Sequence, residues 1–172
     1  MRPLRKAVPV RPTLFTVDRP GPGRLSIMAR PRGSDWLDDE MAGLAAAGVD
    51  VLVCALTPPE LDELGLAGEA GAAAAAGLRF VPVPVPDRCV PEVTAVLPVL
   101  HDLLARLGRG AHVVTHCRAG IGRASLLAAG VLVLGGAPPE EAWARLARAR
   151  GLAVPDTDEQ RAWVVRLAGA RC

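Results

Sequence analysis

Short apolar runs and longer segments with a helical pattern follow one another along the chain. The run at 49–56 is apolar except for one Asp, which is typical of a strand that is covered on both faces. Similar runs predict strands at 13–17, 24–29, 78–83 and 111–115. Apolar positions at helical spacing, with flanking Gly or Pro residues, predict helices at 34–47, 58–77, 92–107, 123–134, 138–151 and 158–168. We expect the second of these helices to be broken near Gly65 and Gly71.

The alternation of strands and helices predicts the fold class. It indicates an α/β fold with a central, mostly parallel sheet of about four to five strands that is flanked by helices. The 172 residues are enough for one domain with a buried core. Because no repeat or linker interrupts the pattern, we expect a single domain over residues 1–172, with residues 1–12 as a loosely ordered N-terminal arm.

Composition excludes several classes of protein. Hydrophobic residues make up 51% of the chain, which excludes a disordered protein. The net charge of +2 gives no reason to expect nucleic acid or a membrane as a partner. No apolar run reaches the ~20 residues that span a bilayer, and the basic start lacks the apolar stretch of a signal peptide. We therefore expect a cytoplasmic protein. The four cysteines show no metal-ligand spacing, and we expect neither a metal nor a cofactor. The sequence leaves the oligomeric state open.

The candidate chemistry lies in residues 113–125, where a buried strand ends and a helix begins. Ligands bind at the carboxyl ends of strands in such folds, and a helix N-terminus there attracts anions. The same field, with Arg123, favours the thiolate form of Cys117. Gly120 and Gly122 let the main chain wrap around a tetrahedral oxyanion, and Arg123 can hold two of its oxygens.

The whole motif carries the argument, because an arginine at a given spacing is weak evidence in this chain. Of the 20 basic residues, 19 are Arg, which indicates a G+C-rich coding bias. A cysteine followed six residues later by Arg is expected about 0.3 times by chance, and adding the Gly at 120 and the His at 116 lowers this to about 0.0006. The alternative is an inert buried cysteine beside a helix cap.

The segment His116-Cys117-x-x-Gly120-x-x-Arg123 resembles the signature of the cysteine-dependent protein tyrosine phosphatases. Over residues 25–165 the chain looks most like their small dual-specificity branch, which includes cyclin-dependent-kinase-associated phosphatase and bacterial relatives. The resemblance also implies a general acid on a loop about 30 residues before the cysteine, and Asp87 in Val-Pro-Val-Pro-Asp-Arg stands at that distance. Read alone, Asp87 is instead a turn or cap residue.

The resemblance implies a metal-independent phosphoprotein phosphatase that acts on phosphotyrosine, with phosphoserine and phosphothreonine as further substrates. Cys117 would attack phosphorus while Asp87 protonates the leaving oxygen, and Asp87 would then activate water. The phosphate would be bound by the loop after the cysteine, which consists of Arg118, Ala119, Gly120, Ile121, Gly122 and Arg123. Two rival functions are a non-catalytic phosphopeptide-binding module and a cysteine-based oxyanion reductase.

One position departs from the family pattern. A Ser or Thr usually follows the signature arginine and stabilises the cysteine thiolate as it leaves, but here the residue is Ala124. Ser125 points about 100° away on a helix and is not an automatic substitute. We expect slower breakdown of the intermediate as a result.

Several other residues have two readings. His116 orders the loop through hydrogen bonds or is a satisfied core histidine. Gln160 orients the attacking water, as in some relatives, or completes a capping box with Thr157. Arg118 contacts the substrate phosphate or is solvated. Cys54 or Cys89 either forms a protective disulfide with Cys117 or is an inert thiol.

Overall fold

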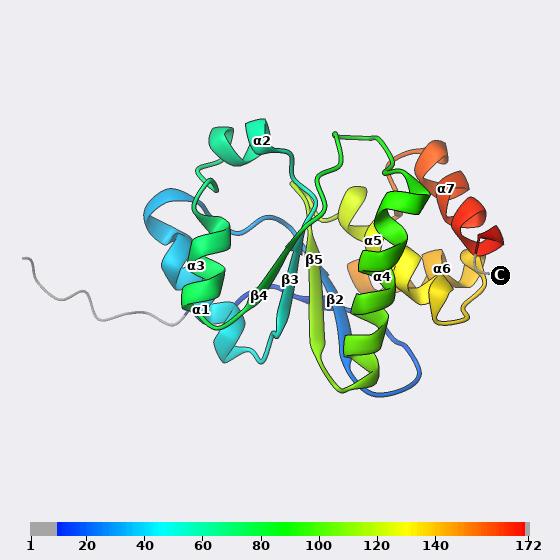
Figure 1. The fold of residues 1–172 in the computed structure, drawn as a ribbon, viewed down its shortest axis with the longest axis horizontal. Coiled ribbons are helices and arrows are strands. Elements are labelled where there is room, and N and C mark those ends of the chain that lie inside the picture. The colour runs from blue at the N-terminus through cyan, green and yellow to red at the C-terminus, as the bar shows by residue number, and fades with distance from the viewer. Residues whose placement is uncertain (1–9, 171–172) are drawn as a thin grey trace, which may run out of the picture.

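The computed structural model describes residues 10–170, and most of the expected N-terminal arm lies outside them. The sheet is built from β1 (Phe15–Thr16), β2 (Arg24–Met28), β3 (Val51–Cys54), β4 (Arg79–Pro82) and β5 (His112–His116). Its strand order is β1-β2-β5-β3-β4, with β5 at the centre (Figure 1). Only β1 runs antiparallel to its neighbour within the described part of the chain. The expected mostly parallel sheet is confirmed.

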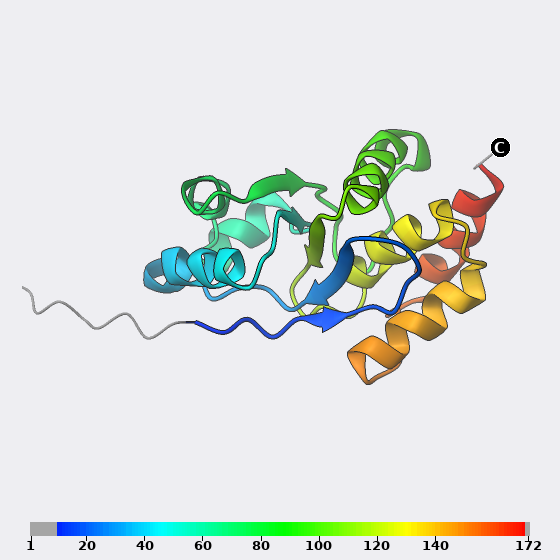
Figure 2. The same cartoon turned by 90° about the horizontal axis from the view of Figure 1, so that it is seen from below.

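Helices cover both faces of the sheet, as predicted (Figure 2). One group follows a short 3-10 turn at Ser34–Trp36 and consists of α1 (Leu37–Ala46), α2 (Pro58–Glu63) and α3 (Glu69–Ala75). The other group consists of α4 (Val93–Gly108), α5 (Arg123–Leu134), α6 (Pro139–Arg150) and α7 (Asp158–Gly169). Within residues 10–170, none of these helices has the length and apolar character needed to cross a bilayer.

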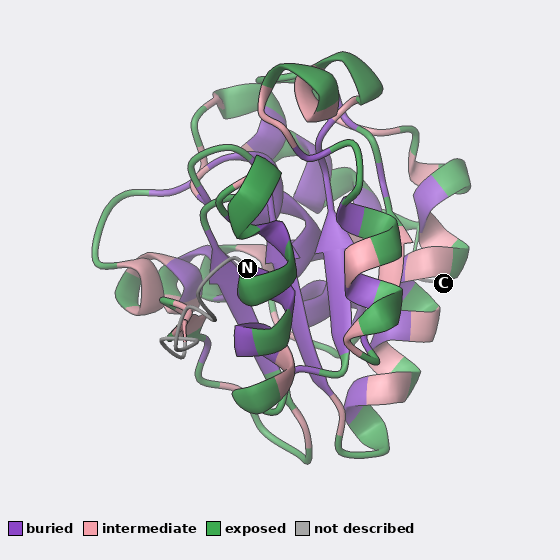
Figure 3. Ribbon diagram, turned by 90° about the vertical axis from the view of Figure 1, so that its left-hand side faces the viewer, coloured by how far each residue is buried: buried purple, intermediate pink, exposed green. Residues whose placement is uncertain are grey.

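The core has two parts because neighbouring side chains of a strand point to opposite faces. In β3, Val51 and Val53 belong to the cluster under α4–α7, whereas Leu52 and Cys54 belong to the cluster under α1 and α3. The sheet is buried between the two layers (Figure 3). Every residue of α5 is buried, since α5 packs on the sheet and is covered by α4, α6 and α7. The helix that follows the signature motif is thus held from several sides.

The segment predicted as one helix over 58–77 forms α2 and α3, with the break at residues 64–68. Gly65 lies in this break with φ +69°, as expected. The predicted break at Gly71 is wrong, because Gly71 lies inside α3. A Gly in an exposed helix costs only about 1 kcal/mol relative to Ala, and the alanines around Gly71 are the best helix formers.

Candidate active site

The site lies where the carboxyl ends of four strands meet at one edge of the sheet. The register places Met28 and Cys54 beside His116, and Pro82 beside Cys54. The chain segments that follow these strands therefore leave the sheet side by side. They carry the loop from Cys117 to Arg123, the segment with Asp87, and the start of α2.

The carbonyl oxygens of the 117–123 loop are held by groups around it. The main-chain N–H of Arg30 donates to the carbonyl of Arg118 at 3.1 Å. The guanidinium of Arg150 donates to the carbonyls of Ala119 and Gly120 at 3.3 and 3.2 Å. Two further carbonyls, those of residues 117 and 122, accept from the His116 ring and from the N–H of Leu126 at 3.2 and 2.9 Å.

These contacts fix the direction of the loop amides. A trans peptide unit directs its C=O and its N–H to opposite sides. Each amide of residues 118–121 and 123 therefore points away from the group that holds the preceding carbonyl. The N-terminus of α5 adds the positive end of its dipole at the same place. Together these groups can bind a tetrahedral oxyanion.

Gly120 is the position in this loop that most clearly requires glycine. Its φ is +70°, and a Cβ atom there would lie 2.6 Å from the main-chain carbonyl of Met28. The loop therefore packs directly on the end of β2. This close contact is a second reason for glycine at 120, and the expected wrapping of the main chain around an oxyanion stays a prediction.

Arg150 is a positioning residue that sequence reasoning missed. It lies in the last turn of α6, and its guanidinium stacks on the Phe15 ring at 4.2 Å from the ring centre. The stacking fixes the guanidinium while it donates to the two loop carbonyls. One among 19 arginines carries no local signal that singles it out.

Arg123 is only 2% exposed and is held by Glu60. Its Nη1 and Nη2 donate to the two carboxylate oxygens of Glu60 at 2.8 and 2.9 Å, and Nη1 also donates to the carbonyl of Val85 at 2.8 Å. A guanidinium has five N–H donors, so these bonds leave two for an oxyanion. Burial lowers the pKa of Arg123, but the hydrogen bonds to Glu60 and the charges of Glu60, Cys117 and Asp87 raise it overall.

Glu60 also belongs to α2 and its cap. The N–H and the hydroxyl of Thr57 donate to the Glu60 carboxylate at 2.9 and 3.0 Å. Hydrogen bonds from Arg123, then those from Thr57, lower the pKa of Glu60 to about 2 against the opposing effect of burial. The Thr-Pro-Pro-Glu segment reads as a capping box in the sequence, but nothing local shows that the Glu reaches Arg123.

The shifted pKa of Glu60 predicts a pH dependence of stability. A carboxyl group with a lowered pKa in the folded state stabilises the protein above its unfolded pKa, and this contribution disappears as pH falls through the folded pKa. For Glu60 the window runs from pH 4.5 down to about 2. Urea unfolding should show that Glu60→Gln lowers the free energy of unfolding by roughly 2–3 kcal/mol near neutral pH, with the difference shrinking across this window.

Glu63→Gln is the matched control, because the Glu63 side chain is 64% exposed. It should change stability by less than about 0.5 kcal/mol at any of these pH values. A difference between wild type and Glu60→Gln that stays constant down to pH 2 would contradict the assignment.

Asp87 lies beside Arg123, as its expected role requires. Its Oδ1 is 3.4 Å from Arg123 Nη2, and its side chain is 63% exposed. The segment before it is tied to the sheet edge, since the N–H of Val85 donates to the carbonyl of Ala55 at 3.0 Å. A carboxyl group in this place can reach both solvent and a phosphate held by Arg123.

Arg118 has charged partners in the structure, whereas the Ser125 side chain has none among the described residues. Arg118 is neither free nor simply solvated, because it forms ion pairs with Glu63 at 3.2 Å and with Glu60 at 3.8 Å. The Ser125 hydroxyl is buried and has no hydrogen-bond partner in the described chain. Ala124 is fully buried in the cluster that also contains Cys117. Within residues 10–170, the Ser125 hydroxyl therefore makes no hydrogen bond to the Cys117 sulfur that would replace the missing Ser or Thr.

Gln160 is buried and touches the loop region. A Cβ at Gly122 would lie 3.2 Å from Gln160 Nε2 and 2.2 Å from Asp156 Oδ2. The main-chain N–H of Gln160 donates to Thr157 Oγ1 at 3.1 Å, so Thr157 caps α7 as predicted. The Gln160 side chain departs from the expected box, because its Oε1 accepts from the N–H of Asp156 rather than of Thr157.

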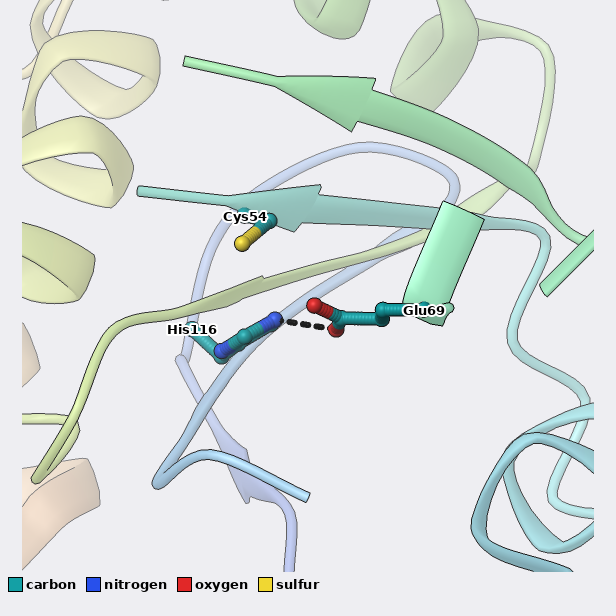
Figure 4. A group of neighbouring side chains, drawn as sticks. All are labelled: Cys54, Glu69 and His116. Carbon is teal, nitrogen blue, oxygen red and sulfur yellow. Dashed lines mark hydrogen bonds and ion pairs between the residues drawn. The ribbon is translucent and has the colours of Figure 1, made fainter. Parts of the chain in front are cut away.

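His116 lies under the loop in a buried cluster with Cys54 and Glu69 (Figure 4). Its Nε2 is 2.5 Å from Glu69 Oε1. Burial lowers the pKa of His116, but hydrogen bonds to Cys54 and Glu69, with their charges, raise it overall. Its other ring nitrogen contacts the carbonyl of Cys117, which is a contact that the predicted role of His116 in ordering the loop requires.

The cysteines bear on the expected disulfide. Cys54, Cys89 and Cys117 are free thiols, and Cys172 lies outside the described residues. Cys54 is buried at the end of β3, whereas Cys89 is exposed. A disulfide between either of them and Cys117 stays a prediction.

Comparisons with known proteins agree with this geometry. Residues 26–137 match the model of the family described as "Polymorphic toxin system, DSP-PTPase phosphatase". No curated protein sequence matches the chain. Among solved structures, kinase associated phosphatase (KAP) superposes with a TM-score of 0.83 at 17% identity, covering 94% of this chain and 97% of that one.

Two further structures share the fold. Tk-PTP has a TM-score of 0.75 at 24% identity, over 95% of this chain and 100% of that one. TpbA of P. aeruginosa has a TM-score of 0.61 at 22% identity, over 94% of this chain and 93% of that one. At these identities the likeness concerns the fold.

Proposed function

Since the chain belongs to the DSP-PTPase phosphatase family of polymorphic toxin systems, we propose that it hydrolyses phosphate monoesters of proteins through a phosphocysteine intermediate, with residues 10–170 acting as one catalytic domain. The observation that supports this most is the loop from Cys117 to Arg123, in which the carbonyls of residues 117–120 and 122 all accept hydrogen bonds from groups around the loop. Its amides and the two remaining donors of Arg123 are then available to an oxyanion.

In the first step the Cys117 thiolate attacks phosphorus in line with the leaving oxygen. The S–P bond forms as the P–O bond to the substrate breaks, and Asp87 donates its proton to the departing oxygen. The loop amides and Arg123 stabilise the equatorial oxygens of the transferring group. Glu60 keeps Arg123 in position through both carboxylate oxygens.

In the second step water attacks the phosphocysteine. The Asp87 carboxylate takes a proton from this water, the P–O bond forms, and the S–P bond breaks to return the Cys117 thiolate and inorganic phosphate. Gln160 lies near Gly122 and can orient the water. No step requires a metal ion.

Phosphotyrosine is the favoured substrate, with phosphoserine and phosphothreonine second. Arg118 is the one basic side chain between Cys117 and Arg123, and it is paired with Glu63 and Glu60. These two carboxylates of α2 therefore offset its charge and disfavour a substrate with several phosphates, such as a polyphosphoinositide. A phosphoprotein monoester fits this charge better.

The test is turnover of an aryl phosphate and of matched phosphotyrosine and phosphoserine peptides by the wild-type protein in a metal chelator. We expect hydrolysis of the aryl phosphate at the same rate with and without chelator. A phosphopeptide-binding module would bind the peptides without releasing phosphate. An oxyanion reductase would act only with a thiol reductant and would release no phosphate from these substrates. Absence of phosphate release by the wild-type protein overturns the proposal.

Replacing the general acid should affect substrates unequally. Asp87→Asn is expected to lower kcat/KM, which reports the first step, by roughly 10²- to 10³-fold on phenyl phosphate, because the departing phenoxide then receives no proton. The loss should be much smaller with an aryl phosphate whose leaving group is a stable anion. Steady-state kinetics with the two substrates checks this.

Asp62→Asn is the control for this prediction, because Asp62 is an exposed residue of α2. It should leave both rates unchanged. An equal loss of kcat/KM on both substrates in Asp87→Asn would show that Asp87 does not act as the acid.

The missing hydroxyl at Ala124 predicts slow breakdown of the intermediate. Rapid mixing with an activated aryl phosphate should give a burst of phenol followed by a slower steady state. Ala124→Ser should raise the steady-state rate by about fivefold, as one added hydrogen bond to the leaving thiolate contributes about 1 kcal/mol. A steady-state rate that does not change in Ala124→Ser would reject this explanation.

A further inference from the structure

A buried cluster under the active-site loop contains a thiol, a carboxyl group and an imidazole. The proposed mechanism gives no role to its thiol or its carboxyl group. Cys54 comes from the end of β3, Glu69 from the first turn of α3, and His116 from the end of β5. Their sulfur, oxygen and nitrogen atoms all lie within 4.8 Å of one another, and all three residues are buried (Figure 4). The three residues are 62 positions apart at most in sequence, with no spacing that marks them as a set.

One oxygen of this cluster has no partner. Glu69 is 1% exposed, and while its Oε1 contacts His116, its Oε2 is buried without a hydrogen bond in the described part of the chain. Figure 4 shows this second oxygen on the side of Cys54. An unpaired buried carboxylate oxygen is costly, so it points to a ligand that would satisfy it.

We propose that Cys54, Glu69 and His116 form a binding site for a divalent metal ion of the zinc type. Thiolate, imidazole and carboxylate are the three kinds of ligand that Zn²⁺ takes, with bonds of about 2.0–2.3 Å. Tetrahedral bonds of that length hold ligand atoms roughly 3–4 Å apart, so the cluster needs only small side-chain movements. The fourth position can hold a water molecule.

The surroundings of His116 fit a metal ligand. A histidine that binds a metal through one ring nitrogen commonly donates the other N–H to a main-chain carbonyl, which fixes the ring. Here Nε2 faces Glu69 and Nδ1 lies 3.2 Å from the carbonyl of Cys117. That hydrogen bond can stay in place while a metal ion replaces the proton between His116 and Glu69.

Charge also balances in this buried place. A divalent ion bound by the Cys54 thiolate, the Glu69 carboxylate and the neutral His116 ring has two anionic ligands and one neutral ligand. The occupied cluster therefore carries no net charge, which avoids the cost of an unpaired buried charge.

The test is metal binding by the reduced, full-length protein in the absence of substrate, so its outcome does not depend on phosphatase activity. After long dialysis against Zn²⁺, we expect one ion per chain and a raised Tm that a chelator reverses. Co²⁺ in place of Zn²⁺ should give a sulfur-to-cobalt charge-transfer band. Cys54→Ala and Glu69→Gln should each weaken binding by at least tenfold and lose the rise in Tm.

Two control variants locate the site. Cys89→Ser changes an exposed thiol away from the cluster, and Cys117→Ser changes the neighbouring active-site thiol. Both should bind Zn²⁺ as the wild type does. Circular dichroism in chelator verifies that each variant is folded. Because Cys54→Ala and Glu69→Gln each remove one ligand, the test still works if one of the two does not fold. No bound Zn²⁺ in the wild type, loss of binding in Cys117→Ser, or full binding in both Cys54→Ala and Glu69→Gln overturns the proposal.

Discussion

Cys117→Ser is expected to lower kcat for aryl phosphates by at least about 10⁴-fold, because a serine hydroxyl is a far weaker nucleophile than a thiolate in this field. Cys117 is 3% exposed and lies in the same core cluster as Ala124, so the small change from sulfur to oxygen leaves the packing intact. The loop amides and Arg123 are unchanged. The variant should therefore still bind substrate while it no longer turns it over.

The measurement pairs steady-state kinetics with binding of a phosphotyrosine peptide by calorimetry. Cys89→Ser is the matched control, since its thiol is exposed, and its rate should stay within about twofold of wild type. If Cys117→Ser kept a tenth or more of the wild-type kcat, Cys117 could not be the nucleophile.

The second large effect is expected for Arg123→Lys, at roughly 10³- to 10⁴-fold in kcat/KM. Three donors of Arg123 hold Glu60 and Val85, and the remaining two serve the phosphate. A lysine has three donors on one nitrogen and cannot serve both sets. It keeps the charge and loses the planar arrangement that connects α2 to the loop.

Arg106→Lys is the control for this change, because Arg106 forms a partly exposed ion pair with Asp102 within α4. Its kinetics should match those of the wild type, and thermal melts of both variants separate a loss of fold from a loss of chemistry. A loss of less than tenfold in Arg123→Lys would show that charge alone is sufficient at this position.

How much the sequence could predict depended on where the interacting residues lie. The fold followed from local pattern, because each strand and helix is a contiguous stretch with its own spacing and breakers. The loop was equally accessible, since Cys117 and Arg123 stand in one short motif. The prediction of a helix break at Gly71 was wrong, because an exposed helix tolerates one glycine among alanines.

The residues that support the loop could not be identified from the sequence. Arg123 meets Glu60 across 63 positions, His116 meets Glu69 across 47, and Arg150 meets Gly120 across 30. Each partner is an ordinary charged residue of a helix when read in its own segment. Only the meeting of β-strand ends at one edge of the sheet shows which of them approach the motif.

The most direct test of the account is to trap the intermediate on the protein. Wild-type protein is mixed rapidly with an activated aryl phosphate, quenched during steady-state turnover, digested and analysed by mass spectrometry. We predict a phosphate adduct on the peptide that carries Cys117, which accumulates because Ala124 slows its breakdown, and no adduct in Cys117→Ser. Steady turnover with no phosphate on Cys117, or with phosphate on another residue, would contradict it.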